Sequence, residues 1–568
     1  MAELIASLDS DALNPTQYGT NNHSEYTWNK HTQEKITQFY FQLVRSEDHT
    51  SLEEKFVEIL QELFTNTTSS TTEHKTLLYR MIAHTRDLVG GKGEYKLSYM
   101  MIYQWAKHDL PSAIKLITYF MTTDDKLNEP YGSWKDVKYF ASYCRNRQED
   151  FSYKLYKYLI GITNIQLIRD NDTYPNGKIS LCAKWVPREN KAFGWMYEDL
   201  AIDYYERALN ITASTIGAKN YAKMYYRNML TKLNKYLDTV QIKMCKKMWQ
   251  AIHFDNITSI TLNKQQYALA FKNKDGSQRT SYDDHYESKQ DRIVCAERFS
   301  KWRANKTTIK GKNVSMYDFV KSAIQFTHHP DAELSDLLNK QWDDNKTQNN
   351  FFDYMIPMVD VSGSMSTDNN IPLYNALGLG IRIAEQSKLG KRCLTFSEKP
   401  SWINLQNCHN FVSCVEYLRA APWGMNTNFH DALNMILHHI KETKLTAHEV
   451  SQLTLVVLSD MQFDASTKNV ASAQAPIDKM IEQRYEEAGK EICGTPYKPP
   501  RIVFWNLRKT NGFPTVSFRP GVSMISGYSP QLMNAFMAQG NKAIQDYNPY
   551  NVLKGILDAP RYNFLHIA

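Results

Sequence analysis

A chain of 568 residues with 42% hydrophobic and 22% charged residues is long enough for more than one core, and its composition indicates a globular rather than a disordered protein. The formal net charge of +7 is modest for this length, so charge alone does not indicate a nucleic-acid-binding protein. The sequence has no run of about 18 apolar residues, so no transmembrane helix is expected.

The cysteines and the first residues indicate the compartment. The eight cysteines show no CxxC pairing, and the chain does not open with a basic segment followed by an apolar one. We therefore expect reduced thiols and a location in the cytoplasm or the nucleus, without secretion. Residues 1–34 are polar and rich in Asn, Thr and Ser, and they are expected to form a flexible polar arm.

Residues 35–345 carry a helical pattern. Apolar residues recur three and four positions apart in successive segments, such as 95–108, and the connections are short. Pro111 and Ser133 stand where two helices are expected to begin. Many helices in series predict an all-α, HEAT-like helical-repeat domain. Residues 273–292 lack apolar periodicity and are expected to form a loop.

After residue 350 the pattern changes to apolar strands that alternate with amphipathic helices. Continuous apolar strands between such helices are typical of a parallel sheet covered on both faces. We therefore predict an α/β, doubly wound domain over residues 351–568, with the boundary near 345–350. The predicted strands are 354–360, 391–397, 452–460 and 501–507, and the predicted helices are 371–389, 429–442 and 475–489.

Three predicted strand ends lead into oxygen-bearing side chains. In the stretch MVDVSGSM, Asp360, Ser362 and Ser364 follow the first strand. Thr427 lies in a later loop, and Asp460 ends the third strand. Ligands of open α/β sheets bind at the carboxyl ends of strands, so these side chains are expected to meet there. Two carboxylates with two or three hydroxyls suit Mg²⁺ or Mn²⁺, and the lack of Cys and His argues against zinc.

This motif resembles the metal-ion-dependent adhesion site (MIDAS) of von Willebrand factor A (vWA) domains. All five positions occur in the order of that family, from DxSxS through the threonine to the aspartate. The resemblance covers residues 351–568. It implies a Rossmann-like fold and a bound metal whose open coordination position takes a partner's acidic group or a water. Two alternatives stay open: DxSxS is an incidental turn, or the metal only stabilises the domain.

Basic residues in the helical part are candidates for nucleic-acid binding. In segment 219–247 cations alternate with tyrosines, which favours phosphate neutralisation and base stacking, although a solvated helix face is equally consistent. The glycine-rich segment 85–99 fails the phosphate-loop pattern, because Gly93 follows its lysine. A bent connection with Arg86 and Asp87 paired locally is the alternative there. The candidate RNA-binding residues are Lys219, Lys223, Arg227, Lys232, Lys235, Arg86 and Lys92.

Both parts of the chain together resemble one family. RDLVGGKGE, GSWKDV and SLCAKWVPRE, followed by VDVSGSM, NTNF, LSDMQFD and VFWNLR, are similar to an uncharacterised family of plants, bacteria, phages and large DNA viruses. That family is in turn similar to TROVE-type proteins such as the Ro ribonucleoprotein autoantigen. In Ro-type proteins a ring of helical repeats, closed by the A domain, binds RNA. The Asn-, Lys- and Tyr-rich composition suits a viral protein.

The sequence therefore favours a non-catalytic RNA-binding scaffold, with a basic helical surface for RNA and a Mg²⁺-bearing A domain for ring closure or partner binding. The alternative is a metal-dependent protein–protein interaction module without nucleic acid. A metal-dependent hydrolase is disfavoured, because the motif holds no general base and no second metal cluster. The expected partners are RNA, structured or with single-stranded ends, and a protein at the metal. No membrane and no small-molecule substrate is expected.

Overall fold

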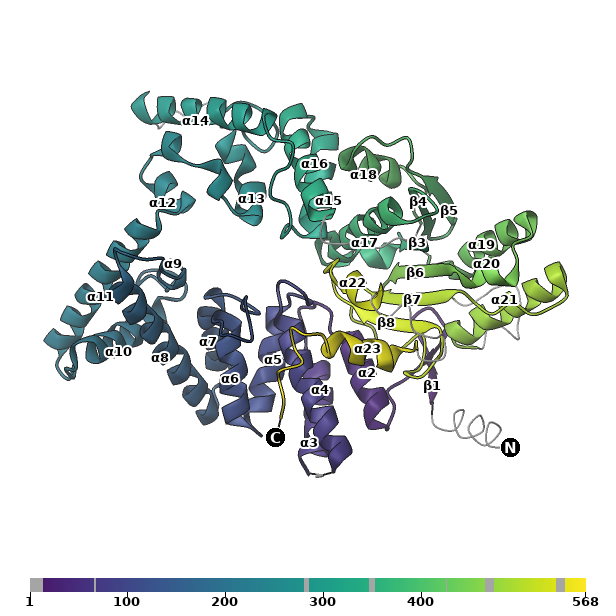
Figure 1. Ribbon diagram of the computed structural model, residues 1–568, viewed down its shortest axis with the longest axis horizontal. Helices are drawn as coiled ribbons and strands as arrows, with labels where there is room; N and C mark the ends of the chain where they lie inside the picture. The colour runs from purple at the N-terminus through teal and green to yellow at the C-terminus, as the bar shows by residue number, and fades with distance from the viewer. Residues whose placement is uncertain are drawn as a thin grey trace.

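The computed structural model describes residues 14–65, 68–279, 286–346, 353–424, 426–464, 475–537 and 547–567. Figure 1 shows a helical half, coloured purple to teal, and an α/β half, coloured green and yellow. The first helices of the helical half pack on the α/β half, and so do its last helices. The two halves together therefore form a closed circuit of elements (Figure 1). Among the described residues, no helix combines the length and the apolar character needed to cross a membrane.

The helical half is a series of helices joined by short connections. Its helices are α2 (Thr32–Gln42), α3 (Thr50–Thr65), α4 (Ser69–Arg86), α5 (Tyr95–Ala106), α6 (Leu110–Met121), α7 (Lys135–Arg147), α8 (Asp150–Thr173), α9 (Cys182–Trp185), α10 (Tyr197–Leu209), α11 (Ile216–Leu237), α12 (Val240–Cys245), α13 (Ser259–Leu269), α14 (Tyr286–Ala304), α15 (Met316–His328) and α16 (Ala332–Lys346). Neighbours in the chain pack together, such as α5 with α6 and α7 with α8. The Thr68 and Asp109 side chains cap α4 and α6, and Pro111 lies in the first turn of α6. The predicted helical region is thus confirmed, and its HEAT-like repeat character stays a prediction.

The α/β half contains one sheet and the helices that cover it. Its strands are β3 (Tyr354–Asp360), β4 (Arg392–Phe396), β5 (Ser401–Asn404), β6 (Leu453–Ser459), β7 (Arg501–Asn506) and β8 (Val522–Ser526). Its helices are α17 (Thr367–Gln386), α18 (Phe411–Arg419), α19 (Phe429–Thr443), α20 (Ala447–Ser451), α21 (Ile477–Cys493), α22 (Leu532–Met537) and α23 (Pro549–Leu557). The strand order is β5-β4-β3-β6-β7-β8, and neighbouring strands are parallel except β4 and β5. The predicted α/β fold of this half is confirmed, and its resemblance to the vWA domain stays a prediction.

Two hydrophobic cores lie on opposite faces of this sheet. Along β3, Val359 belongs to one core and Met358 to the other, because successive side chains of a strand point to opposite faces. The core of Val359 continues into the helical half and includes Ile36 and Trp342, whereas the core of Met358 includes residues of α19 and α21. The helical and α/β halves therefore share one continuous core.

The N-terminal segment differs from the prediction. Over its described part, residues 14–34 are not a loose arm: β1 (Thr16–Tyr18) and β2 (Ser24–Tyr26) form an antiparallel hairpin. The backbone of Tyr26 exchanges two hydrogen bonds, of 3.0 and 2.9 Å, with Phe513 of the α/β half. This pairing, with a distant part of the chain, satisfies polar groups that were expected to face water. Residues 1–13 lie outside the described residues.

The segment 273–292 is only partly the predicted loop. Helix α14 already begins at Tyr286. The Asp291 carboxylate accepts hydrogen bonds from the backbone N–H groups of Trp249 and Gln250, at 2.6 and 3.0 Å. These contacts anchor the helix from outside its own sequence, which explains why its local pattern did not predict it.

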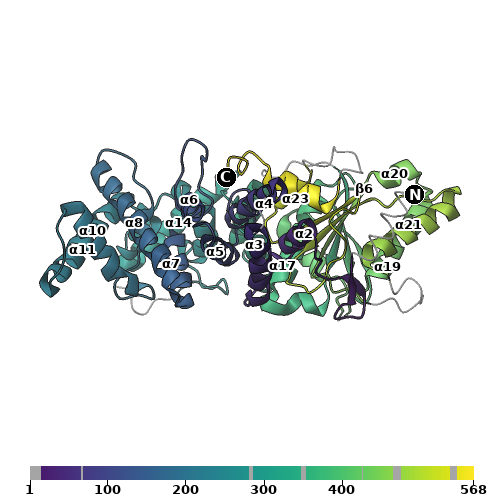
Figure 2. The same cartoon turned by 90° about the horizontal axis from the view of Figure 1, so that it is seen from below.

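The circuit is closed by different contacts at its two ends. At one end α2 packs on β8, and α23 packs on α4, beside which it lies in Figure 2. Arg80 of α4 pairs with Asp558 and donates a hydrogen bond of 3.0 Å to the carbonyl of Leu565. At the other end α15 and α16 pack on α17 and α18, where the ring centroids of Trp342 and Phe411 are 3.8 Å apart.

Candidate metal centre

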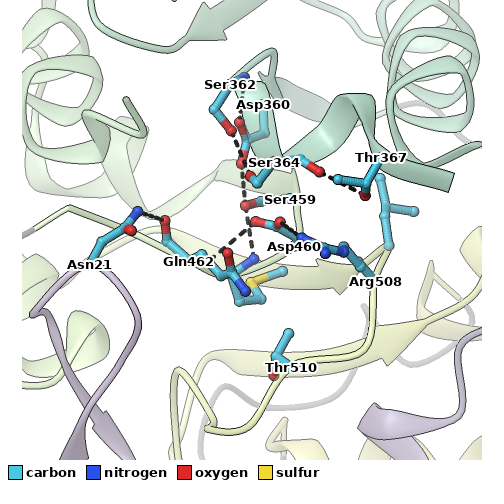
Figure 3. A network of polar contacts seen from close by, with 12 residues as sticks. Asn21, Asp360, Ser362, Ser364, Thr367, Ser459, Asp460, Gln462, Arg508 and Thr510 are labelled. Atoms are coloured by element: carbon cyan, nitrogen blue, oxygen red, sulfur yellow. Dashed lines mark hydrogen bonds and ion pairs between the residues drawn. The ribbon is translucent and has the colours of Figure 1, made fainter. Parts of the chain in front are cut away.

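Asp360 lies at the carboxyl end of β3 and is completely buried. One of its carboxylate oxygens accepts a hydrogen bond of 2.9 Å from the backbone N–H of Ser362. The other accepts one of 2.5 Å from the hydroxyl of Ser459, at the end of the neighbouring strand β6. The hydroxyl oxygens of Ser362 and Ser364 are 3.1 Å apart (Figure 3). Three of the predicted site residues are therefore joined in one polar network.

Asp460 follows β6 and is also completely buried. Its carboxylate accepts hydrogen bonds of 3.3 Å from the backbone N–H of Gln462 and of 3.3 Å from the guanidinium of Arg508 (Figure 3). Because β3 and β6 are parallel neighbours, their carboxyl ends bring Asp360 and Asp460 to the same edge of the sheet. The expected proximity of the two carboxylates is thus seen.

The electrostatics of this edge suit a cation. Burial, and then the charge of Asp460, raises the pKa of Asp360 to about 7. Negative charge is therefore crowded here, and Arg508 compensates only part of it through a single contact with Asp460. Two carboxylates with serine hydroxyls are hard oxygen donors, which fit Mg²⁺ or Mn²⁺. Among the described residues no group of three His, Cys, Asp or Glu side chains could hold a metal, so any metal here would depend on the hydroxyls.

Thr427, the fifth predicted ligand, is buried in the loop before α19. Its backbone N–H donates a 2.7 Å hydrogen bond to the carboxylate of Asp464, and its carbonyl accepts one of 3.1 Å from the N–H of Asp464. The next residue, Asn428, donates a 3.2 Å hydrogen bond to the carbonyl of Ser397, just after β4. These bonds fix the loop of Thr427 at the same edge of the sheet, through its backbone.

The sequence did not point to several members of this site. Ser459 and Arg508 lie where site residues of an α/β sheet are expected, at or just after the carboxyl end of a parallel strand. Asn21, in contrast, comes from the turn between β1 and β2, and its amide donates 2.9 Å hydrogen bonds to the Gln462 carbonyl and the Asp464 carboxylate. Nothing near Asn21 in the sequence indicates this distant contact.

Arg86 was predicted to contact RNA, and this prediction was wrong. Its guanidinium is buried and donates two hydrogen bonds of 2.7 Å to the two carboxylate oxygens of Asp136. The alternative of a local pair between Arg86 and Asp87 was also wrong, because Asp87 pairs with Arg561 and accepts further hydrogen bonds from the Tyr562 hydroxyl and its own loop. The Arg86 side chain is therefore structural.

The prediction for Lys92 was wrong for a similar reason. Lys92 is only 4% exposed, and its ammonium group donates to the carbonyls of Tyr40 and Leu43, at 3.0 and 3.2 Å, and to the hydroxyl of Ser526. Burial lowers the pKa of Lys92 well below its usual range. Lys92 thus joins the end of α2 to strand β8, and no phosphate can reach it.

The other candidate RNA-binding residues share helix α11. Two of them form surface ion pairs, Lys223 with Glu198 and Arg227 with Glu189. Tyr226, which was expected to interleave with them, is buried and so cannot stack with a base. The five residues on this helix are Lys219, Lys223, Arg227, Lys232 and Lys235.

A pocket of about 700 Å³ lies between α9, α11, α12 and the segment 186–191. Two of the predicted residues, Arg227 and Lys235, line it, together with basic residues that were not predicted. Glu189 is the one acidic side chain among its described lining residues. We call it the cationic pocket; its basic side chains are Lys184, Arg188, Lys191, Arg227, Lys235 and Lys246.

Comparisons with known proteins agree with the two-part organisation. Residues 354–554 match a domain of unknown function, DUF7788, and residues 162–297 match another, DUF2828. The chain is also 28% identical over 510 residues to the uncharacterized protein L728 of Acanthamoeba polyphaga mimivirus, covering 86% of this chain and 80% of that protein. The latter similarity supports the expected link to large DNA viruses. Neither matched family is the TROVE or the vWA family, so that resemblance stays a prediction.

Proposed function

We propose that the protein is a non-catalytic RNA-binding scaffold, in which the helical half carries the RNA-binding surface. The cationic pocket is the observation that carries this proposal. Six basic side chains line it, from α9, the segment 186–191, α11 and the end of α12, and the one acidic residue among its described lining residues, Glu189, is paired with Arg227. Such a cluster favours a polyanion, because each basic side chain that neutralises a phosphate releases counterions condensed on the nucleic acid and so adds to the affinity.

The resemblance to TROVE-type and vWA proteins supports the same function. A helical half closed into a circuit by an α/β domain is the arrangement that this resemblance implies. In this proposal the α/β half completes the circuit and presents the metal centre to a partner.

Filter binding of single-stranded RNA at two salt concentrations tests the proposal. We expect the double variant Arg188→Glu and Lys235→Glu to bind at least about tenfold more weakly, and to show a smaller dependence of affinity on salt. Both residues are exposed, so the fold should be retained. The matched control reverses Lys399 and Lys490, two exposed lysines of the α/β half, and should bind like the wild type. Equal binding by all three proteins would reject the pocket.

A second candidate function is metal-dependent protein binding, and the crowded carboxylates of Asp360 and Asp460 favour it. Asp360, Ser362, Ser364, Thr427 and Asp460 would hold Mg²⁺, and the metal would supply an open coordination position for an acidic group of a partner. A pull-down with EDTA and, separately, with nuclease distinguishes the two functions. Loss of the partner on chelation alone indicates metal-dependent protein binding, whereas loss on nuclease treatment alone indicates RNA.

A further inference from the structure

Three lysines surround the indole ring of Trp185 at the end of α9. The ammonium nitrogens of Lys135, Lys138 and Lys184 are 4.3, 5.1 and 5.4 Å from the centroid of this ring. The first two come from α7 and the third from α9. Each distance lies within the range of a cation–π interaction, so the ring gathers three positive charges at one place.

The acid beside these charges, Asp136, favours the charged form of Lys135, but its carboxylate is paired with Arg86. Within the described residues, no carboxylate forms an ion pair with Lys135, Lys138 or Lys184. Burial, and then the charge of Lys135, lowers the pKa of both Lys138 and Lys184. Burial, and then the charge of Lys264 on α13, lowers the pKa of Lys135 itself. The lysines therefore repel one another, and an anion placed among them would relieve that repulsion.

Aromatic rings continue from this cluster along the helical half. The ring centroids of Phe193 and Tyr139 are 5.3 Å apart, and those of Tyr139 and Tyr95 are 5.6 Å apart. Lys138 lies over this row, 5.5 Å from the centroid of Phe193 and 5.5 Å from that of Tyr139. Tyr95 and Tyr139 remain 39% and 38% exposed, although tyrosines of this helical half are often buried. The row thus leaves two tyrosine side chains partly exposed to solvent, with a cation beside them.

We propose that this row binds the bases of a single-stranded nucleic acid by stacking, while its lysines bind the phosphates. We call it the aromatic–lysine strip; it comprises Tyr95, Tyr139, Phe193, Trp185, Lys135, Lys138 and Lys184. The inference rests on the proposed RNA-binding function and names the residues and the binding mode. Lys184 belongs to both the strip and the cationic pocket, so one strand can follow both.

The alternation of rings and cations favours a single strand over other polyanions. A base in a single strand exposes its face, which stacks on an aromatic side chain whatever its sequence. In a duplex these faces are hidden between base pairs, and an acidic peptide has carboxylates but no such faces. Figure 1 shows that α5, α7 and α9, which contribute to the strip, follow one another along the circuit, so the strip is extended rather than confined to one helix.

Fluorescence anisotropy with a labelled single-stranded poly(A) oligonucleotide tests the strip. The double variant Tyr95→Ala and Tyr139→Ala should raise the Kd about tenfold or more, because stacking of one base on one ring contributes that much. The variant Tyr95→Phe and Tyr139→Phe keeps both rings and should bind like the wild type. Alanine is a good helix former, so α5 and α7 should be retained. Tyr417→Ala, at a 55% exposed tyrosine of α18, is the matched control.

Two further probes separate the outcomes. An oligonucleotide of the same length without bases should bind weakly to the wild type. The alanine variant should bind it with the same Kd as the wild type does. If the wild type binds poly(A), and the pocket variant Arg188→Glu and Lys235→Glu weakens binding while the tyrosine variant does not, the strip is refuted and the proposed function stands. If the wild type binds neither RNA nor DNA at low salt, both are overturned.

Discussion

The guanidinium of Arg561 donates two hydrogen bonds, of 2.5 and 2.8 Å, to the completely buried carboxylate of Asp87. The hydroxyl of Tyr562 donates a third, of 2.6 Å. The two residues are 474 positions apart in the chain: Asp87 follows α4, and Arg561 follows α23. This pair therefore ties the C-terminal segment to the helical half.

Loss of this pair should destabilise the whole protein. Arg561→Ala leaves the Asp87 carboxylate buried without its cation, so we expect the free energy of unfolding to fall by about 3 kcal/mol. Urea denaturation followed by tryptophan fluorescence measures the effect. Arg561→Lys keeps the charge and loses the paired geometry, so it should cost less. An alanine variant as stable as the wild type would show that the pair does not hold the circuit closed.

Mg²⁺ should stabilise the folded protein through Asp360 and Asp460. A ligand that binds only the native state raises its stability by about 2.7 kcal/mol at one hundred times its Kd. We expect the melting temperature to rise with MgCl₂ over EDTA, and Asp360→Asn to abolish the rise. Asp343→Asn, at an exposed aspartate of α16, should respond like the wild type. A rise that persists in Asp360→Asn would place the metal elsewhere.

Arg508 should compete with the metal for Asp460. Its guanidinium contacts the same carboxylate at 3.3 Å, and its side chain is 30% exposed, so the contact is worth about 0.5–1 kcal/mol. Arg508→Gln should therefore lower the Kd for Mg²⁺ about two- to fivefold, as measured by isothermal titration calorimetry. Weaker Mg²⁺ binding by this variant would mean that Arg508 organises the site instead.

Acid should weaken the contact of the N-terminal hairpin. His23 and His430 have ring centroids 6.0 Å apart, and burial, then the charge of His430, lowers the pKa of His23 from 6.5 to about 4. Burial, and then Arg484, also lowers the pKa of His430, while Asp431 opposes this. The unfolded chain takes up the proton first, so this stability is complete above pH 6.5 and is lost as the pH falls toward 4.

Between pH 6.5 and pH 4, protonation linked to His23 alone should lower the free energy of unfolding by about 3 kcal/mol. Urea denaturation at several pH values measures this change. His23→Phe should flatten this pH dependence. His438→Gln, at a histidine exposed on α19, should leave it unchanged. A pH dependence of the same size in His23→Phe would assign the acid sensitivity to other groups.

The sequence predicted strands β3, β4, β6 and β7, and it missed β1, β2, β5 and β8. The prediction for 354–360 coincides with β3, because its apolar run ends at Asp360. β5 has only four residues and lies at the edge of the sheet, so its pattern is too short to recognise. The placement of Asp360 and Asp460 at one edge of the sheet was predictable because each stands at the end of an apolar strand.

The failures have one physical cause. Arg86 and Lys92 stand in a glycine-rich, polar segment that suggests a surface loop. Their partners, Asp136 and Ser526, are 50 and 434 positions away, so no local pattern predicts that these cations are buried. The aromatic–lysine strip was missed for the same reason, because its rings come from separate helices.

The packing of α2 on β8 also governs how the protein can be made. The hydroxyl of Ser526 donates a 2.8 Å hydrogen bond to the carbonyl of Tyr40, which leaves the ribosome 486 residues earlier. At about 5–20 residues per second, the surface of α2 that packs on β8 would stay uncovered for roughly half a minute to a minute and a half, whereas α3 and α4 can pack on α2 soon after it is made. Chaperone capture during translation should therefore concentrate on this surface of α2 and end only when synthesis is nearly complete.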